Sequence, residues 1–295
     1  MPSLTLENSS QDHNQSGTLY VVPTPIGNLE DLTIRSLNIL KTVDLIGAED
    51  TRNTRKLLSH YEVHCPLTSY HEHSDQSKLD YLVSELKNGK QVAIVSDAGM
   101  PGISDPGTVL IQRAIEEDIN VVVLPGANAA LCALVGSGLP TDQFYFYGFL
   151  PRKNKERKQA WDELLKQKST IILYESPYRL VDTLKELKEH LGNRRMAVAR
   201  ELTKKFEEYI RGSVDEVLEW AKTGIIKGEF CLVVEGSDDI ILNDTEWWKE
   251  LTINEHVDHY IESEQLMSKE AIKKVAKDRG LQKRDIYQIY HKIDK

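Results

Sequence analysis

The sequence has no uninterrupted run of about 18 apolar residues, the length that a helix needs to cross a membrane. Its first 17 residues are polar and lack the apolar segment of a secretion signal. We therefore expect a cytoplasmic protein in which residues 1–17 form a disordered tail. With 295 residues, the chain is long enough for two α/β domains and a small appendage.

Cysteine is also scarce. Cys65, Cys132 and Cys231 are odd in number and far apart, which excludes a fully paired disulfide framework and a CxxC metal or redox motif. We expect all three to be buried thiols, because free cysteine behaves as a small hydrophobic residue.

Common nucleotide and metal motifs are missing too. The chain has no GxxxxGK[ST] phosphate loop, and the glycines that follow its strand-like runs do not form GxGxxG. His60, His64, His71 and His73 lie near Cys65, but their spacing does not match a closed zinc site. We therefore expect no metal.

Positive charge is in deficit, since 37 basic side chains stand against 46 acidic ones and the net charge is −9. This balance argues against a protein whose whole surface binds nucleic acid. The basic residues are nevertheless clustered: residues 152–158 hold five and residues 268–295 hold nine, whereas residues 241–267 hold one. Each cluster can bind a polyanion such as RNA, or it can be an ordinary solvated helix face.

What the sequence does contain is an alternation of short apolar runs with helical patterns. The runs at residues 19–22, 43–46, 91–95 and 120–124 are rich in valine and isoleucine. Such runs, separated by helices, predict a mostly parallel sheet with crossover helices. They define an N-terminal α/β domain over residues 18–140.

A second series of runs predicts a second domain over residues 141–240. Its strands are expected at residues 144–147, 170–174, 196–199, 206–211 and 230–235, and its helices near 155–167, 178–190 and 214–222. Two of these strands follow one another without a helix, which predicts hairpin pairing and a mixed α/β domain. We expect the aromatic run at 144–147 to be a core strand, although such side chains can also stack on bases.

Residues 241–295 show a third pattern. Ile272 and Val275 belong to one apolar helical stripe, Gly280 ends it, and Ile286 and Ile289 belong to another. Two short amphipathic helices joined by a tight turn predict a C-terminal helical, helix-turn-helix-like unit. Such a unit can bind a partner or serve only for packing.

Small and rigid residues follow three of the expected strands. These segments are Pro23–Asn28, Val95–Gly107 and Pro125–Ala130. The carboxyl ends of parallel strands meet at one edge of a sheet, so the three segments together predict a pocket for a small molecule. Glycine lets backbone amides approach the ligand and proline orders the loops beforehand, although each segment alone can be an ordinary tight turn.

The same segments carry a resemblance to a known family. They include PTPIGN at residues 23–28, GAEDTR at 47–52, TSYHEH at 68–73, VSDAGMPGISDPG at 95–107, VLPGANA at 123–129, GFLPR at 148–152, YESPYR at 174–179 and ARELTK at 199–204. In these stretches the chain resembles the tetrapyrrole-methylase-like family of S-adenosylmethionine-dependent methyltransferases, and within it a branch that methylates small-subunit ribosomal RNA. The resemblance covers residues 18–293.

The resemblance implies two α/β domains with a cleft for S-adenosylmethionine between them. It also implies transfer of the methyl group to the ribose 2′-hydroxyl of a cytidine in the decoding region of small-subunit ribosomal RNA, within the assembled subunit, by a homodimer. Asp97 is expected to be the carboxylate nearest the cofactor, with main-chain contacts from residues 99–104. The cofactor-binding residues expected on this basis are Pro25, Asp97, Ala98, Gly99, Met100, Pro101, Gly102, Ile103, Ser104, Ala127, Asn128 and Ala129.

A ribose hydroxyl is a poor nucleophile, and a nearby carboxylate or lysine can take its proton. The residues of suitable type in the family-like segments are Glu201, Lys204 and Asp50, although each can equally belong to a salt bridge, such as one between Asp50 and Arg52. The residues expected to contact RNA are Arg52, His71, His73, Arg152, Lys153, Lys155, Arg157, Lys158, Lys273, Lys274, Lys283 and Arg284.

Two other functions remain open at this point. One is a methyltransferase of the same fold that acts on a tetrapyrrole, which would not need the basic residues at 152–158 or the C-terminal unit. The other is an RNA-binding assembly factor that keeps the cofactor pocket without catalysis. Binding of the cofactor without turnover would favour the second.

Overall fold

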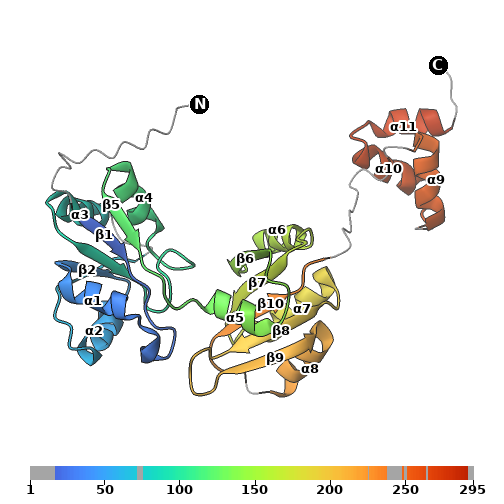
Figure 1. Cartoon of the computed structure of the whole chain (residues 1–295). Coiled ribbons are helices and arrows are strands. Elements are labelled where there is room, and N and C mark those ends of the chain that lie inside the picture. The colour runs from blue at the N-terminus through green and yellow to red at the C-terminus, as the bar shows by residue number, and fades with distance from the viewer. Residues whose placement is uncertain are drawn as a thin grey trace. The chain divides into compact units, whose positions relative to one another are not determined.

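The computed structural model describes residues 17–71, 76–224, 226–237, 248, 251–263 and 265–291. The expected tail lies outside these residues except for Gly17. The chain divides into two compact units (Figure 1). The first runs to Leu164 and continues over Ser169–Gly236; the second contains Leu165–Lys168 and the residues from Ser237 onward.

The first unit begins with a five-stranded sheet in which all neighbouring strands are parallel. Its strand order is β3-β2-β4-β1-β5. The strands are β1 (Thr18–Val21), β2 (Leu45–Ala48), β3 (Leu67–Ser69), β4 (Val92–Val95) and β5 (Asn120–Val123). The connecting helices are η1 (Leu29–Asp31), α1 (Ile34–Thr42), α2 (Thr51–His60), α3 (Gln76–Lys87) and α4 (Thr108–Glu116). The parallel sheet expected from the sequence is confirmed.

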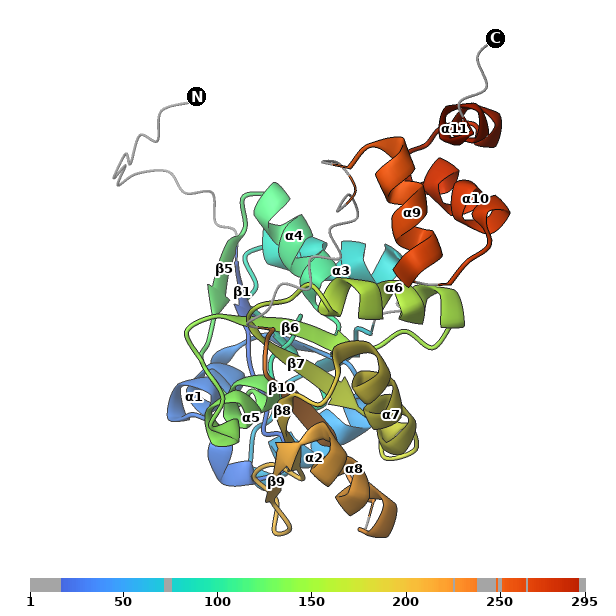
Figure 2. The same ribbon diagram turned by 90° about the vertical axis from the view of Figure 1, so that its right-hand side faces the viewer.

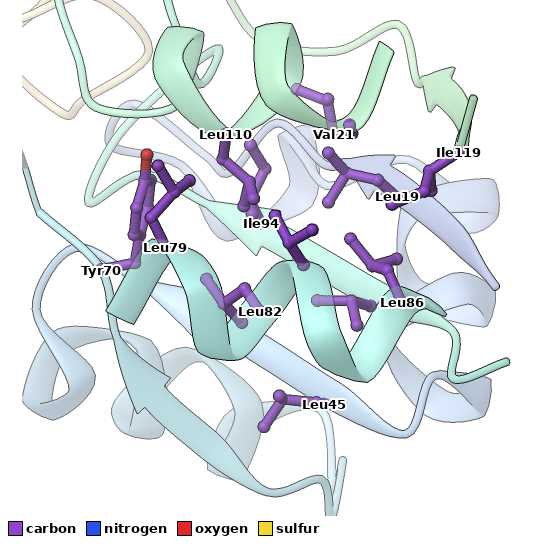
Figure 3. Close-up of a cluster of buried hydrophobic side chains, with 13 residues drawn as sticks. Leu19, Val21, Leu45, Tyr70, Leu79, Leu82, Leu86, Ile94, Leu110 and Ile119 are labelled. Atoms are coloured by element: carbon purple, nitrogen blue, oxygen red, sulfur yellow. The ribbon is translucent and has the colours of Figure 1, made fainter. Parts of the chain in front are cut away.

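Helices cover both faces of this sheet, which explains why β2 and β4 are apolar along their whole length. On one face, leucines of α3 and α4 pack against the strands (Figure 3). The side chains that meet there include Leu19, Leu82, Leu86, Ile94 and Leu110. On the other face, Leu40 of α1 and Leu58 of α2 pack against Ile46. Each such buried side chain stabilises the fold by about 1.5–3 kcal/mol.

The second sheet of the first unit has the order β6-β7-β10-β8-β9. Only the β6–β7 pair is parallel, so the predicted mixed sheet is confirmed. Its strands are β6 (Phe144–Phe149), β7 (Thr170–Glu175), β8 (Arg195–Arg200), β9 (Glu208–Ser213) and β10 (Phe230–Val234). The helices of this part are α5 (Ala129–Ser137), α6 (Asn154–Leu164), α7 (Leu180–Leu191) and α8 (Val214–Thr223), with α7 and α8 packed side by side (Figure 2).

Helix α5 belongs to the second sheet by its contacts, although it lies inside the range 18–140 that the sequence assigns to the N-terminal domain. Ala130, Ala133 and Leu134 pack against Ile172 of β7 and Cys231 of β10. The chain therefore crosses to the second sheet about ten residues before the end of that range.

The structure corrects two expectations about strands. Strand β2 begins at Leu45 because Val43 still closes helix α1, where its N–H donates to Ile39 O at 3.0 Å. The aromatic run is a strand, as expected, but β6 is an edge strand and Phe144 is 45% exposed, so the run is not a core strand.

The second unit contains three helices among its described residues: α9 (Ile253–Ser263), α10 (Ser268–Asp278) and α11 (Lys283–Tyr290). Its own core includes Val257, Ile272, Val275 and Ile286. The two predicted helices are present as α10 and α11. Helix α9 was not expected from the sequence, because its acidic residues obscure the apolar spacing of Val257 and Tyr260.

The expectation of three buried thiols is wrong for Cys132. Cys231 is buried, Cys65 is partly buried and Cys132 is exposed. Cys132 lies on α5, whose inner face is filled by Ala133 and Leu134, so the remaining side points outward. Burial raises the pKa of the Cys65 thiol to about 11.

No helix in the described part of the chain is long and apolar enough to span a membrane.

Candidate active site

The loop between β4 and α4 has an unusual backbone. Gly99, Gly102 and Gly107 all have positive φ, at 86°, 85° and 141°. Ser104 has φ of 59°, a conformation that costs about 1 kcal/mol or more for a residue with a side chain. The glycines are therefore required by the turns of the loop itself, and Ser104 is a point of strain in it.

This loop is joined to the loop after β1. The Thr24 N–H donates to Gly99 O at 2.9 Å, and the Gly99 N–H donates to Thr24 O at 3.0 Å. The Thr24 hydroxyl also donates to Ser96 O at 3.0 Å. Pro23 and Pro25 flank Thr24 and have no N–H to donate, so Thr24 supplies the donors of this bridge.

A cavity of about 330 Å³ opens beside the two loops. Both halves of the first unit line it, the first half being the residues before β6 and the second half the residues from β6 onward. From the first half come Ile26, Ala98, Gly99, Met100, Ile103, Ser104, Asp105, Asn128 and Ala129; from the second come Phe149, Tyr174, Glu175, Ser176, Pro177, Ala199, Leu202, Gly228, Glu229, Phe230 and Cys231. We call this space the main cavity. Its size and mostly apolar lining suit a ligand of cofactor size.

Most of the expected cofactor residues lie together at the main cavity. Those that line it are Ala98, Gly99, Met100, Ile103, Ser104, Asn128 and Ala129. Asn128 also caps α5, where its side chain accepts from Leu131 N at 3.0 Å. Pro101 and Ala127 belong to the same loops without lining the cavity. Gly102 lines a second cavity, described below.

Asp97 and Pro25 line a separate, third cavity. The Asp97 carboxylate accepts from the Asp50 N–H at 3.1 Å and from the Asn53 side chain at 2.9 Å. These bonds connect the loop after β4 to the start of α2. Asp97 therefore orders the strand ends in this structure, and the carboxylates at the main cavity are Asp105, Glu175 and Glu229.

Asp105 is not among the site residues expected from the sequence, although it lies in the segment Val95–Gly107. Burial and the nearby Glu49 and Asp97 carboxylates raise its pKa to about 7, and a hydrogen bond from Ser96 only partly opposes them. Asp105 lines both the main cavity and the second cavity. A carboxylate with such a pKa in a cavity is a candidate for proton transfer.

Glu175 was also missed. It is 3% exposed at the end of β7, where it accepts from Ser176 N at 2.8 Å and from the Thr183 hydroxyl at 2.6 Å. Arg179 Nε lies 3.6 Å from Glu175 Oε1, the oxygen that accepts from Ser176 N. The second half of the first unit thus presents a buried, hydrogen-bonded carboxylate to the main cavity.

Glu201 and Lys204 form a cluster with Glu229. Lys204 Nζ donates to Glu201 at 3.0 Å and to Glu229 at 2.9 Å. Burial alone would lower the pKa of Lys204, but the two carboxylates outweigh it and raise the pKa. The Lys204 chain also packs where a side chain at Gly27 would stand, since a Cβ there would lie 2.4 Å from Lys204 Cγ. These contacts favour a structural role, and the expected catalytic role of Glu201 and Lys204 stays a prediction.

Asp50 is the N-cap of α2 and is paired with Arg52. Its carboxylate accepts from Arg52 N at 2.8 Å and lies 2.6 Å from Arg52 Nη2. Hydrogen bonds from Arg52 lower the pKa of Asp50 to about 2. A carboxylate with such low proton affinity is a poor base, so the salt-bridge alternative describes Asp50 and Arg52 in this structure.

The basic residues near α6 divide into two kinds. Arg152, Lys153, Lys155 and Lys158 are exposed. Arg157 is the exception, since its side chain is 11% exposed and donates to Glu186 at 2.6 Å and to Thr183 at 2.8 Å. These bonds hold α6 to α7, and the expectation that Arg157 contacts RNA stays a prediction.

The basic residues of the second unit are more accessible. Lys273, Lys283 and Arg284 are exposed, whereas Lys274 lies over the Tyr260 ring at 4.3 Å.

His71 is exposed and lines the second cavity. His73 lies outside the described residues. No group of three or more potential metal ligands occurs among the residues that the structure describes.

Comparison with known proteins places this chain in a family. The family model described as tetrapyrrole (corrin/porphyrin) methylases matches residues 18–218. Among solved structures, a cobalt precorrin-4 methyltransferase superposes with a TM-score of 0.56 at 17% identity, covering 77% of this chain and 98% of that chain. A diphthine synthase superposes with a TM-score of 0.58 at 10% identity, covering 74% and 90%. The chain belongs to the tetrapyrrole methylase family and has its fold.

Curated relatives narrow the position within the family. A ribosomal RNA small subunit methyltransferase I of Bacillus subtilis is 54% identical over 93% of this chain and 94% of its own length. One of Halalkalibacterium halodurans is 52% identical over 97% and 98%. Within the methylase family, the chain therefore belongs to the ribosomal RNA small subunit methyltransferase I branch.

Proposed function

We propose that this methyltransferase binds S-adenosylmethionine in the main cavity and methylates the ribose 2′-hydroxyl of a cytidine in the decoding region of small-subunit (16S) ribosomal RNA. The main support is the cavity itself, which gathers seven of the cofactor residues expected from the sequence. The near-full-length similarity to relatives named ribosomal RNA small subunit methyltransferase I supports the RNA substrate.

The lining of the main cavity fits the cofactor. Ile103 is 40% exposed and Phe149 is 54% exposed, so two large apolar side chains are available to cover a ligand. Asn128 and the glycine-rich backbone of the loop after β4 offer hydrogen-bond partners for its polar groups. When bound, S-adenosylmethionine supplies an activated methyl group on a positively charged sulfur. The protein then has to place the acceptor oxygen in line with that methyl group, which can account for much of the rate enhancement.

The exposed basic residues suit an RNA partner. We expect Arg152, Lys153 and Lys155 next to α6, and Lys283 and Arg284 in α11, to contact phosphates. Replacing the first three or the last two with glutamate should weaken binding to small-subunit particles about tenfold at low salt and flatten the salt dependence. Replacing exposed Lys222 of α8, which is paired with Glu219, is the matched control. Equal salt slopes in all variants would assign both clusters to ordinary solvated surface.

The protein acts as a homodimer in this proposal, and the outer side of α5 is our candidate for the interface. Leu131 is 48% exposed and Val135 is 75% exposed, and Cys132 lies between them. Exposed apolar side chains on one helix commonly mark a surface for association. Val135→Glu should convert a dimer to a monomer in light scattering. An unchanged mass would exclude α5 as the interface.

The function is tested by methyl transfer. Small-subunit particles from cells lacking this protein are incubated with labelled S-adenosylmethionine and the protein, and the modified nucleotide is mapped. A label on one ribose 2′-oxygen is expected. Cofactor binding without any label on RNA would overturn the proposal and leave a tetrapyrrole acceptor or a non-catalytic assembly role.

A further inference from the structure

A second cavity lies next to the strained loop after β4. Its volume is about 420 Å³. It is lined by Tyr70, His71, Gln76, Leu79, Gly102, Ser104, Asp105, Pro106, Gly107, Thr108 and Val109. The residues that it shares with the main cavity are Ser104 and Asp105. We call this space the second cavity.

The loop residues between the two cavities are held by specific contacts. Gly102 N–H donates to Pro106 O at 3.2 Å, which closes the loop around Ser104 and Asp105. A Cβ on Gly148 of β6 would lie 2.9 Å from Ser104 Oγ, so the absence of a side chain there makes room for Ser104. The register of β6 against β7 shifts between Phe146 and Gly148, next to this contact. Strain at Ser104 and an irregular strand beside it mark the point where the two cavities meet.

The geometry points to Asp105 as the group that accepts the proton from the acceptor hydroxyl, with the acceptor nucleoside held in the second cavity. This inference rests on the proposed function and adds to it the location of the acceptor and the identity of the base. A carboxylate that borders both cavities can contact a hydroxyl in one while that hydroxyl faces a methyl group in the other. The second cavity offers the exposed His71 ring and the side-chain oxygen of Gln76, whose nitrogen donates to Asp80 at 3.0 Å. A ring and a hydrogen-bond acceptor suit a nucleoside. Tyr70 also lines this cavity but is only 8% exposed.

The proposed step is a direct transfer of the methyl group from sulfur to the 2′-oxygen. A lone pair of the 2′-oxygen forms the new O–C bond, and the C–S bond breaks with its electron pair going to sulfur, which becomes a neutral thioether. The hydroxyl proton passes to a carboxylate oxygen of Asp105 and then to water. S-adenosylmethionine, the methyl donor of the proposed function, is the co-reactant of this step.

The surroundings of Asp105 suit this role better than those of the other candidates. Its pKa of about 7 lets it be deprotonated at neutral pH while keeping affinity for a proton. Asp50 has a pKa of about 2, and the contacts of Lys204 raise its pKa and keep it charged. The charged or titratable groups that act electrostatically on Asp105 are Glu49, Asp97 and Tyr174. The other titratable groups that line the two cavities are Tyr70, His71, Glu175, Glu229 and Cys231.

The first test compares wild type, Asp105→Asn and Asp105→Glu in methylation of small-subunit particles. In Asp105→Asn we expect kcat to fall at least about 100-fold while the Kd for S-adenosylmethionine, by calorimetry, changes less than threefold. Asp105→Glu should recover part of the rate. The control Asp118→Asn makes the same chemical change on an exposed residue after α4 and should have wild-type activity.

The pH profile gives an independent readout. In wild type, kcat should rise about tenfold per pH unit at low pH and level off near pH 7, and this inflection should disappear in Asp105→Asn. A wild-type profile without that inflection would overturn the inference. So would an Asp105→Asn enzyme with unchanged kcat, or one in which loss of cofactor binding accounts for the whole defect. Absence of RNA methylation by wild type would instead overturn the proposed function.

The place of the acceptor is tested by filling the second cavity. Val109 lies in the first turn of α4, is 58% exposed and lines the second cavity. Val109→Trp should raise KM for the particle or lower kcat at least about tenfold while leaving cofactor Kd unchanged. Ile115→Trp, on the same helix and 60% exposed, is the matched control. Equal activity of the two variants would exclude the second cavity as the acceptor site.

Discussion

The two sheets of the first unit contribute to the site in different ways. The parallel sheet supplies loops at its strand ends, and these contain positive-φ residues such as Gly99, Gly102 and Ser104. The mixed sheet supplies side chains from the strands and from the turn after β7, among them Tyr174 and Glu175. A parallel sheet ends all its strands at one edge, whereas a mixed sheet presents both ends of its strands there.

Because of this difference, we expect substitutions in the loops to affect ligand binding and substitutions on the strands to affect stability. In the loops, backbone shape and open space decide whether a ligand fits, so substitutions there should affect affinity before they affect folding. On the strands, the lining residues also hold the fold together. Glu175, for example, accepts from Thr183, which itself accepts from Arg157. Substitutions on the strands should therefore lower stability first.

The largest effect is expected from Gly99→Val. A Cβ at Gly99 would lie 3.3 Å from Ile26 Cγ2, at a φ of 86° that a β-branched residue rarely adopts. S-adenosylmethionine should bind at least about 100-fold more weakly, or about 2.7 kcal/mol, by calorimetry. Gly138→Val is the matched control, because Gly138 also has positive φ but no atom within 4 Å of its Cβ position. Wild-type affinity in Gly99→Val would separate this loop from cofactor binding.

Glu175→Gln should lower stability more than it lowers cofactor affinity. The substitution removes the charge of a buried carboxylate that accepts from Thr183 and Ser176 and lies beside Arg179. We expect a loss of about 2 kcal/mol in the free energy of unfolding by urea. Cofactor affinity should fall less than tenfold. Glu189→Gln, an exposed position on α7, should change stability by less than about 0.5 kcal/mol. A stable Glu175→Gln protein with lost cofactor binding would remove the distinction between loops and strands.

Asp105→Asn should raise stability while it lowers activity. The ordinary pKa of 3.8 is raised to about 7 in the folded state, so the folded state holds the proton more tightly than the unfolded chain. Ionising Asp105 therefore lowers stability as pH rises from about 4 to about 7, and the lost stability stays lost above that range. After allowance for partial exposure, the variant should gain about 1 kcal/mol at pH 8 and almost nothing below pH 4. Thermal unfolding at these two pH values measures the difference, and an equal gain at both would contradict it.

The smallest effect is expected from Tyr174→Phe. The Tyr174 hydroxyl accepts from Ala130 N at 3.2 Å, in the first turn of α5. Losing this acceptor should cost about 1 kcal/mol of unfolding free energy and weaken cofactor binding by a few-fold at most. Tyr145→Phe removes a hydroxyl that donates to exposed Glu163 and should cost less. A loss of affinity as large as that in Gly99→Val would show that Tyr174, although it lies on a strand, is needed for ligand binding as the loop residues are.

Much of the fold could be predicted from the sequence because its signals are local. The valine-rich runs of β1, β4 and β5 are bounded by turn residues, and each is a strand within one or two residues of its predicted position. Helix α9 was missed because its acidic residues hide an apolar spacing that includes Val257 and Tyr260. The position of α5 on the second sheet could not be predicted, since an apolar helix of alanine and leucine has no sequence feature that selects a sheet.

The site was predictable at the level of segments and less so at the level of side chains. The segments after β4 and β5 both reach the main cavity. Which of two aspartates in one segment lines the main cavity depends on loop geometry, in particular on the positive φ of Ser104, and the sequence pattern does not contain that information. The burial of Arg157 within a basic run depends on its partners Thr183 and Glu186, which lie far along the chain.

The bridge between Thr24 and Gly99 has a consequence for how the site can move. Since prolines occupy both positions beside Thr24, the two loops can pair in a single register and cannot slide past one another. They should therefore move as one body, and the amide hydrogens of Thr24 and Gly99 should exchange with solvent at similar, slow rates. Any rearrangement that accompanies ligand entry should therefore occur among the residues that the second sheet contributes to the lining of the main cavity.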